Sequence, residues 1–334
     1  MARVRVLVTV DWLHTVPGPA LKMRERIESA GFQVEIKSRG RSLDAAEVIP
    51  LLPGVGGYLA GNDVLSAEVL AHADRLRVIS RQGAGYDRID LDECTRRGIV
   101  VCNAFGAGAP AVAEFAIAAM LVLARRILPG RSALREGDWL ARTDLGGGTL
   151  VGATLGIIGL GHIGRQLARL VSGFGMRVIY HDVVRSEDFE AETGTEFVTL
   201  EDLLAQSDFV SVHVQLNKAT RHLIGERELS RMRPSAYLVN TSRGGVVDET
   251  ALYEAVAGAK IAGAALDVLE SEPIAADNPL LQLGDRVLLT PHIAALNDSA
   301  KLAMLEMATD NLLDVLQGRR PRVVTNPAVY ARAQ

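Results

Sequence analysis

The segment Thr154-Leu155-Gly156-Ile157-Ile158-Gly159-Leu160-Gly161-His162-Ile163-Gly164 decides the fold of this chain. Its first five residues predict a buried strand, and the residues after Gly164 carry apolar side chains at helical spacing. Glycines at 159, 161 and 164, placed between a strand and a helix, have the spacing of a dinucleotide-binding turn.

Each glycine of this turn has its own role. The first permits a tight turn, the second lets the backbone approach a pyrophosphate, and the third lets the helix pack on the strand. The helix N-terminus, at His162 and Ile163, offers N–H groups to the phosphates. A strand at 177–180 leads to Asp182, whose carboxylate suits ribose hydroxyls and repels a 2′-phosphate. NAD is therefore favoured over NADP, although Arg185 is close enough to weaken the preference.

Composition limits the classes of protein. The chain has 334 residues, 48% of them hydrophobic, which is enough for two domains with cores of their own. A net charge of -4 and the lack of a basic stripe argue against nucleic acid. No apolar run in the sequence reaches the ~20 residues of a membrane span. Cys94 and Cys102 are too few for a disulfide framework or a cysteine metal site, so we expect a cytoplasmic protein that holds no metal.

Strand-like and helix-like segments alternate along the chain, which predicts parallel sheets covered by helices on both faces. Because the glycine signature lies mid-chain, we expect a nucleotide domain inserted into another α/β domain. We expect a long helix at 111–127, followed by Pro129 and Gly130. The strands are expected at 4–10, 34–37, 55–60, 76–80, 99–102, 154–158, 177–180, 209–214, 237–240, 261–267 and 287–290. The other helices are expected at 21–30, 66–72, 91–97, 201–206, 226–232, 249–257 and 298–317.

Three polar clusters follow predicted strands in the second half of the chain. They are Asn240-Thr241-Ser242-Arg243, Asp267 with Glu272-Pro273, and Pro291-His292. Open α/β sheets bind their ligands at such strand ends.

Reduction of a 2-oxo acid needs a cation for the carboxylate, a proton donor for the carbonyl oxygen, and a group that keeps the donor charged. Arg243, His292 and Glu272 supply this set. Taken singly, Arg243 also fits a surface ion pair, His292 a packed histidine, and Glu272 an ordinary turn. Their occurrence at successive strand ends favours catalysis. His213 lines the cofactor pocket or packs in the interior, and packing is the favoured interpretation.

A further loop follows the strand predicted at 76–80. It reads Arg81-Gln82-Gly83-Ala84-Gly85-Tyr86-Asp87, and its glycines expose backbone N–H groups that could hold a carboxylate. The alternative is a plain turn.

With these motifs in place, the chain resembles the D-2-hydroxyacid dehydrogenase family. The resemblance extends from about residue 55 to residue 317. The segments that carry it are Gly83-Ala84-Gly85-Tyr86-Asp87-Arg88-Ile89-Asp90, Ala111-Val112-Ala113-Glu114, Gly159 to Gly164, Asn240 to Asp248, Asp267, Glu272-Pro273 and Pro291-His292.

The resemblance implies two doubly wound parallel-sheet domains. A Rossmann NAD-binding domain, residues 104–295, would be inserted into a flavodoxin-like substrate domain, residues 1–103 and 296–334. Arg243 would bind the substrate carboxylate, His292 would exchange the proton, and Glu272 would pair with His292. Cofactor contacts would come from Gly159, Gly161, His162, Ile163, Gly164, Asp182, Thr241 and Asp267, with Asp267 at the nicotinamide carboxamide. Substrate contacts would come from Arg81, Ala84 and Gly85.

The resemblance leaves the substrate open. Arg81 matches a phosphate-side arginine of phosphoglycerate dehydrogenases, which we take as the leading possibility. Ala60 stands where those enzymes commonly carry another arginine, so a glyoxylate or hydroxypyruvate reductase comes next. A homodimer is implied, with the helix near Ala111 at the contact. The alternative from another class is an NAD-sensing corepressor-like binding protein.

Overall fold

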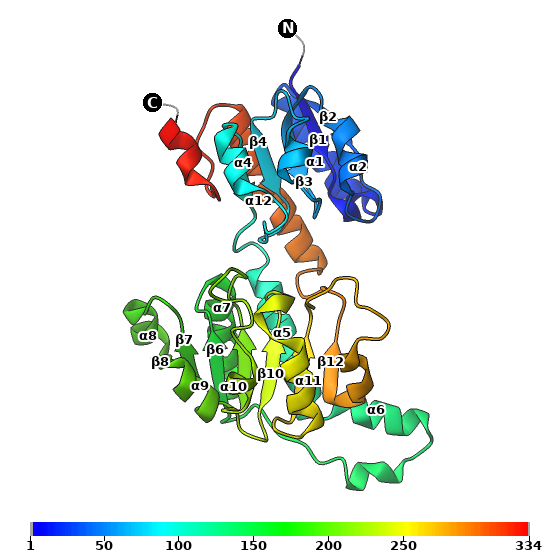
Figure 1. The fold of residues 1–334 in the computed structure, drawn as a ribbon, viewed down its shortest axis with the longest axis vertical. Helices are drawn as coiled ribbons and strands as arrows, with labels where there is room; N and C mark the ends of the chain where they lie inside the picture. Colours follow the sequence, from blue (N-terminus) through cyan, green and yellow to red (C-terminus); the bar gives the residue numbers. More distant parts are fainter. Residues whose placement is uncertain (1–2, 333–334) are drawn as a thin grey trace. The chain divides into compact units, whose positions relative to one another are not determined.

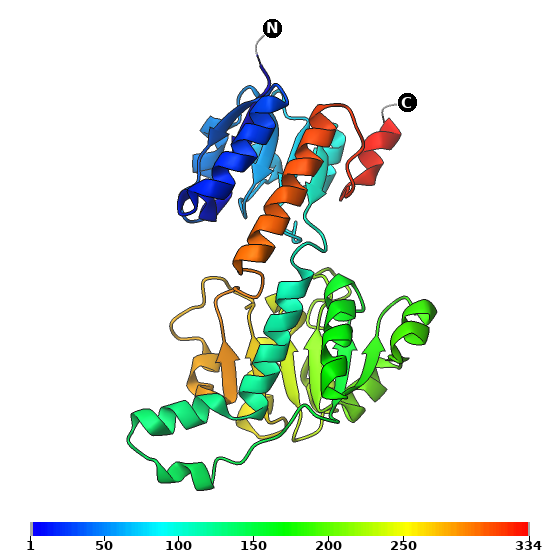
Figure 2. The same cartoon turned by 180° about the vertical axis from the view of Figure 1, so that it is seen from behind.

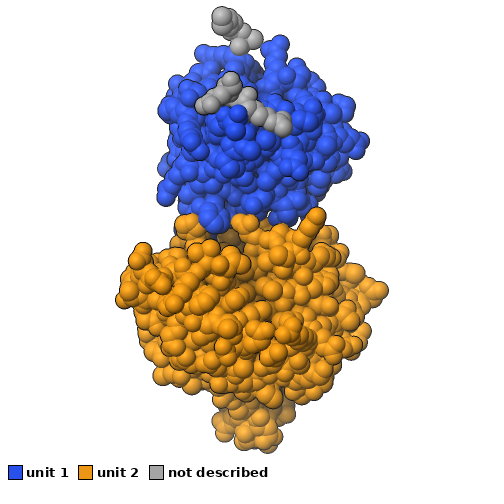
Figure 3. Space-filling model, turned by 60° about the vertical axis from the view of Figure 1, so that its left-hand side comes forward, with its two compact units in different colours: residues 1–108, 298–334 blue, residues 109–297 orange. Residues whose placement is uncertain are grey.

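The computed structural model describes residues 3–332 and divides the chain into two compact units. Unit 1 combines Met1–Gly108 with Asp298–Gln334, and unit 2 is Ala109–Asn297 (Figure 3). Unit 1 is therefore built from both ends of the chain, and unit 2 is continuous.

Unit 1 contains a five-stranded parallel sheet among its described residues, in the order β2-β1-β3-β4-β5. This is the flavodoxin-like strand order. The strands are β1 (Arg5–Val8), β2 (Gln33–Ile36), β3 (Val55–Ala60), β4 (Val78–Arg81) and β5 (Val100–Asn103). The helices are α1 (Pro17–Ser29), α2 (Ala45–Val48), α3 (Ala67–Leu70), α4 (Leu91–Arg96) and α12 (Asp298–Leu316), with 3-10 turns at Asp11–His14, Ile49–Leu51 and Pro327–Arg332.

Helices cover both faces of this sheet because side chains along each strand alternate between the faces. Val8 and Leu59 belong to one core, to which α1 and α12 contribute. Figure 2 shows these two helices side by side on this face of the sheet. Leu7 and Tyr58 face the other core, shared with α2, α3 and α4.

Unit 2 contains a seven-stranded parallel sheet within its described length, in the order β12-β11-β10-β9-β6-β7-β8 (Figure 1). The order reverses between β6 and β9, as in a Rossmann fold. The strands are β6 (Thr154–Ile158), β7 (Arg177–His181), β8 (Glu196–Phe197), β9 (Phe209–Val212), β10 (Tyr237–Asn240), β11 (Gly263–Leu266) and β12 (Val287–Leu289). The predicted class, two doubly wound parallel-sheet α/β bodies, is confirmed.

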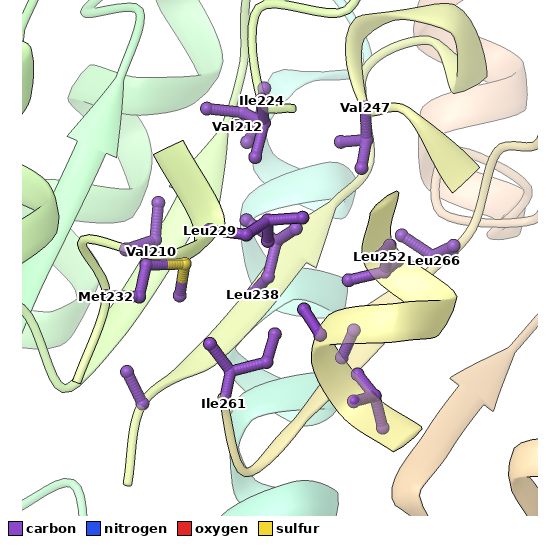
Figure 4. Close-up of a cluster of buried hydrophobic side chains, with 14 of the residues drawn as sticks. Val210, Val212, Ile224, Leu229, Met232, Leu238, Val247, Leu252, Ile261 and Leu266 are labelled. Atoms are coloured by element: carbon purple, nitrogen blue, oxygen red, sulfur yellow. The ribbon is translucent and has the colours of Figure 1, made fainter. Parts of the chain in front are cut away.

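Two apolar cores cover the faces of the larger sheet. The first joins α9 (Leu200–Gln206), α10 (Glu226–Leu229) and α11 (Glu249–Ala257) to the sheet. Figure 4 shows its centre, where Leu238 of β10 lies among side chains from neighbouring elements. The second contains α5 (Ala109–Ala124), α7 (His162–Val171) and α8 (Glu187–Thr193). Further 3-10 turns lie at Leu140–Thr143, Ser172–Phe174, Gly244–Val246 and Pro279–Arg286.

The prediction for the long helix was wrong at its end. α5 stops at Ala124, and Arg126 turns the chain with a left-handed φ of 48°. A new helix, α6 (Ile127–Arg135), then runs through Pro129 and Gly130. Proline is tolerated in a first helical turn because its missing N–H has no partner inside the helix there. Pro129 and Gly130, which follow the predicted helix, therefore lie near the start of a second helix that the sequence analysis did not predict.

Within residues 3–332, no helix is long and apolar enough to cross a membrane.

Candidate active site

The turn after β6 has the geometry that a dinucleotide needs. Gly159 has a φ of 97°, and a Cβ atom there would lie 2.8 Å from the carbonyl oxygen of His213. A Cβ at Gly164 would collide with the carbonyl oxygen of Gly159, so only glycine allows α7 to pack this closely. At Gly161, by contrast, a Cβ would have no described atom within 4 Å. The middle of the turn is thus open toward the N-terminus of α7, and helix N-termini of this kind favour phosphate groups.

Asp182 lies beside this turn. Its Oδ2 accepts a hydrogen bond from the backbone N–H of Leu160 at 2.7 Å, and its Oδ1 accepts one from Val184 at 3.4 Å. Arg185 does not turn toward Asp182: its guanidinium binds Glu190 at 2.7 Å and holds the pKa of that carboxyl below its usual value. Asp182 therefore lies at the rim of the turn, and Arg185 is engaged by Glu190.

The three polar clusters predicted after strands meet at one edge of the sheet. β10, β11 and β12 are adjacent and parallel, so their carboxyl ends lie side by side. Arg243 follows β10, Asp267 follows β11, and His292 follows β12. Asn240, which ends β10, shapes the first loop: its Nδ2 donates to the carbonyl oxygen of Arg243 at 3.0 Å.

Asp267 is the structural centre of this edge, a role that sequence reasoning did not identify. Its side chain is 2% exposed, and its Oδ1 accepts hydrogen bonds from Thr290 Oγ1 (2.6 Å) and the N–H of Ile293 (2.8 Å). Its Oδ2 accepts one from the N–H of Ala294 at 2.8 Å. The carbonyl oxygen of Asp267 also accepts the N–H of His292 at 2.8 Å. One carboxylate therefore holds the whole turn on which His292 lies.

His292 and Glu272 form the pair predicted for proton exchange. His292 Nδ1 lies 2.9 Å from Glu272 Oε2, and the N–H of Leu269 donates to Glu272 Oε1 at 3.2 Å. Burial alone would raise the pKa of Glu272. The hydrogen bond and charge of His292, the Leu269 N–H and the charge of Arg243 together lower this pKa below its ordinary value. The lowered pKa favours the charged carboxylate beside the His292 ring.

Two shielded polar atoms lie near this edge without a hydrogen-bond partner among residues 3–332. They are Thr241 Oγ1, directly after β10, and His213 Nδ1, directly after β9. His213 Nε2 contacts Ser211 Oγ at 2.9 Å, and burial lowers the pKa of His213 to about 3, so the ring is neutral. Since buried polar atoms usually have partners, these two atoms suit a bound ligand. Together with the open turn at Gly161, they fit a dinucleotide.

In unit 1, the loop after β4 is held by its own backbone and by Asn103. Asn103 Nδ2 donates to the carbonyl oxygen of Ala84 at 2.6 Å, while Ala84 itself is exposed and Gly85 is half-buried. Arg81 folds over Gly83, donating to the carbonyl oxygen of Gln82 and to Asn62 Oδ1.

Comparison with known proteins identifies the family. Residues 117–294 match the model described as D-isomer specific 2-hydroxyacid dehydrogenase, NAD binding domain. A glyoxylate reductase of Korarchaeum cryptofilum is 46% identical over 270 residues, covering 80% of this chain and 81% of that protein. A D-3-phosphoglycerate dehydrogenase of Archaeoglobus fulgidus is 39% identical over 297 residues, 89% of this chain but 55% of that longer protein.

A solved structure gives the same assignment. The D-lactate dehydrogenase of Aquifex aeolicus, in complex with NAD and lactic acid, has a TM-score of 0.83 and 31% identity, covering 96% of this chain and 99% of that one. The predictions of family, enzyme class and cofactor are therefore confirmed. The chain belongs to the D-isomer specific 2-hydroxyacid dehydrogenase family, the NAD-dependent oxidoreductases that act on CH–OH groups.

Proposed function

We propose that this protein is a glyoxylate reductase, which reduces glyoxylate to glycolate with NADH. The observation that carries the chemistry is the 2.9 Å contact between His292 and Glu272, with Arg243 close enough to stabilise the same carboxylate. The set comprises a cation for the carboxylate of an oxo acid, and a proton donor that lies beside a carboxylate with a lowered pKa.

Similarity supports glyoxylate over the phosphorylated substrate that the sequence alone favoured. Six further relatives that we compared, 37–43% identical to this chain, are also glyoxylate reductases. The structure adds a local argument. Ala60 is 1% exposed in the core of unit 1 and supplies no cation, and Arg81 is engaged by Gln82 and Asn62. A loop of this kind offers little binding energy to a dianionic phosphate. A small acid such as glyoxylate carries a single carboxylate and needs no second cation.

We assign the following roles. When bound, NADH supplies the hydride. Arg243 binds the carboxylate through its planar fork of N–H groups and polarises the carbonyl. His292, as imidazolium, donates a proton to the carbonyl oxygen, and Glu272 stabilises that imidazolium before transfer. In unit 1, the exposed backbone at Ala84 and Gly85 binds carboxylate oxygen atoms, and Arg81 orders that loop.

For the cofactor, we propose that Gly159, Gly161, His162, Ile163 and Gly164 bind the pyrophosphate through their backbone. Asp182 binds the ribose and selects NAD over NADP, and the shielded Oγ1 of Thr241 finds its partner in the cofactor. Asp267 uses three of about four lone-pair positions on its turn, which leaves one for the nicotinamide carboxamide. Residues 104–295 would then be the NAD-binding domain, and residues 1–103 with 296–334 the substrate domain.

We also propose a homodimer in the cytoplasm. Unit 2 exposes large apolar side chains on and after α6, with Ile127, Leu134, Trp139 and Leu140 between 49% and 70% exposed. Such a run of exposed apolar residues is typical of a protein contact. The helix near Ala111, where the contact was expected, is α5, and its residues 111–113 are buried, so we place the contact on α6 and the residues after it. Both cysteines are buried free thiols, as expected for a reducing compartment.

The test is oxidation of NADH against glyoxylate, hydroxypyruvate, pyruvate, 2-oxoglutarate, oxaloacetate and 3-phosphohydroxypyruvate. We expect the highest kcat/KM with glyoxylate and the lowest with the phosphorylated acid. A preference for 3-phosphohydroxypyruvate would restore the phosphoglycerate assignment and make Arg81 the residue to mutate. If no acid is reduced, the proposed activity is wrong although the fold stands.

A further inference from the structure

The loops that carry Arg243 and Glu272 are in direct backbone contact. A Cβ atom added at Gly244 would overlap the carbonyl carbon and oxygen of Leu269 and the nitrogen of Glu270. No side chain fits between the two segments, so displacement of one loop displaces the other. The relative position of Arg243 and Glu272 depends on how tightly these loops are held together.

Two carboxylates join the loops through reciprocal hydrogen bonds. Glu270 N–H donates to Glu249 Oε1 at 2.6 Å, and Glu249 N–H donates to Glu270 Oε1 at 3.1 Å. Asn278 Nδ2 donates to Glu249 Oε2 at 3.0 Å. Asp248, which caps α11, adds a third negative charge one residue away. Like charges at this separation repel, so a cation beside the three carboxylates would stabilise the junction.

His222 faces this junction from a third segment. It has a left-handed φ of 51°, and its N–H donates to the carbonyl oxygen of Gly245 at 2.8 Å. Its Nε2 lies 3.2 Å from Glu270 Oε1, and its Nδ1 lies 3.7 Å from Asp248 Oδ2. The imidazole thus contacts one carboxylate on each loop, and both contacts strengthen when the ring is protonated. Arg221, its neighbour in the chain, adds a second positive charge beside Gly245.

We propose that His222 is a positioning residue for the dehydrogenase reaction, which as an imidazolium clamps the Arg243 loop to the Glu272 loop through Asp248 and Glu270. The segment around His222 is itself anchored, because Ile224 N–H donates to Val246 and Asp248 N–H donates to Ile224. The inference rests on the roles proposed above for Arg243 and Glu272.

The expected size of the effect follows from exposure. The three side chains of the clamp are 30–37% exposed, and ion pairs near the surface change an equilibrium by up to about fivefold each. Two such contacts, lost together, predict a three- to tenfold fall in kcat/KM.

The kinetic test compares wild type with His222→Gln between about pH 6 and about pH 9, a range that spans ordinary histidine titration. We expect wild type to exceed the variant by three- to tenfold at the acid end and the ratio to approach one at the alkaline end. His222→Lys, which keeps the charge, should retain most of the activity, and His72→Gln, at an exposed histidine of unit 1, should match wild type. A ratio that does not change with pH would show that His222 only fills space.

A second measurement does not need turnover. Amide hydrogen–deuterium exchange at about pH 6 should be faster in residues 243–248 and 267–273 of His222→Gln than of wild type, with His72→Gln unchanged. Unchanged exchange in both segments overturns the clamp, whatever the substrate. If wild type reduces no oxo acid but exchange responds, the proposed function fails while the clamp stands.

Discussion

Asp267→Asn should destabilise unit 2 and slow the reaction, although the substitution changes one atom. The wild-type carboxylate is 2% exposed and accepts two hydrogen bonds on Oδ1 and one on Oδ2. An asparagine has one acceptor oxygen. Its best placement keeps that oxygen toward Thr290 and Ile293, so the amide group faces the N–H of Ala294, donor against donor.

The cost can be worked from this geometry. A hydrogen bond to a charged group contributes ~1.5–3 kcal/mol, and one buried donor left unsatisfied costs ~1–3 kcal/mol. Losing the bond to Ala294 and weakening the other two predicts about 2–4 kcal/mol less stability. The same turn holds His292 at a left-handed φ of 56°, which is unfavourable by about 1–2 kcal/mol without support. Because a displacement of about 1 Å can cost ~100-fold in rate, we expect kcat to fall at least tenfold.

The assay is calorimetry of the apoprotein with parallel steady-state kinetics. A chain with two units can unfold in more than one step, so the transition of unit 2 is identified as the one that NADH shifts to higher temperature. Asp277→Asn, at an exposed aspartate of the same unit, is the matched control. If the Asp267 variant unfolds within about 0.5 kcal/mol of wild type and keeps its kcat, Asp267 does not anchor the turn.

Four other expectations can be checked with single variants. His292→Ala should lower kcat by ~10²–10⁴-fold while NADH still binds in a fluorescence titration; normal turnover would mean that the proton donor is elsewhere. Arg243→Lys should raise KM for glyoxylate about tenfold or more, because an ammonium lacks the planar fork, and an unchanged KM would contradict carboxylate binding. Asp182→Ser should bring kcat/KM for NADPH closer to that for NADH, and an unchanged ratio would exclude Asp182 from ribose recognition. Since the pKa of Glu272 is lowered in the folded protein, its stabilising effect is complete above the unfolded pKa of about 4.3 and is lost as the pH falls through the folded value. The difference in melting temperature between wild type and Glu272→Gln should therefore shrink on acidification, and a constant difference would refute the linkage.

Much of unit 2 was predictable because local signals agree with tertiary packing. The predicted limits of β6, β10 and α11 match the structure, since each strand has a buried apolar run and Asp248 caps the helix. β8 was missed because two exposed residues carry no pattern, and α8 was missed because its sequence is mostly polar.

The candidate site also has features that the sequence predicted and features that it did not. The residue types of Arg243, Glu272 and His292 indicate their chemistry, and the parallel strands bring their loops to one edge of the sheet. The anchoring role of Asp267 was not predictable in this way, because two of its three partners are backbone N–H groups 26 and 27 residues away. Backbone donors occur at almost every residue, so no sequence pattern shows which of them a side chain uses. The contacts of His222 were not predicted for a related reason, because its partners are carboxylates of a kind common on protein surfaces.

The construction of unit 1 from both chain ends has a consequence for synthesis on the ribosome. α12 lies against β3, β4 and β5, Ser80 Oγ donates to the carbonyl oxygen of Ala308 at 2.7 Å, and Asn326 bonds to the backbone of Ile99 and Val101. Residues 1–108 are translated before residues 298–334, so this face of their sheet stays uncovered until α12 has been made. Unit 2 emerges as one continuous piece and can finish folding earlier. Unit 2 can thus finish folding before unit 1, and until α12 has been made the apolar face of β3–β5 remains exposed.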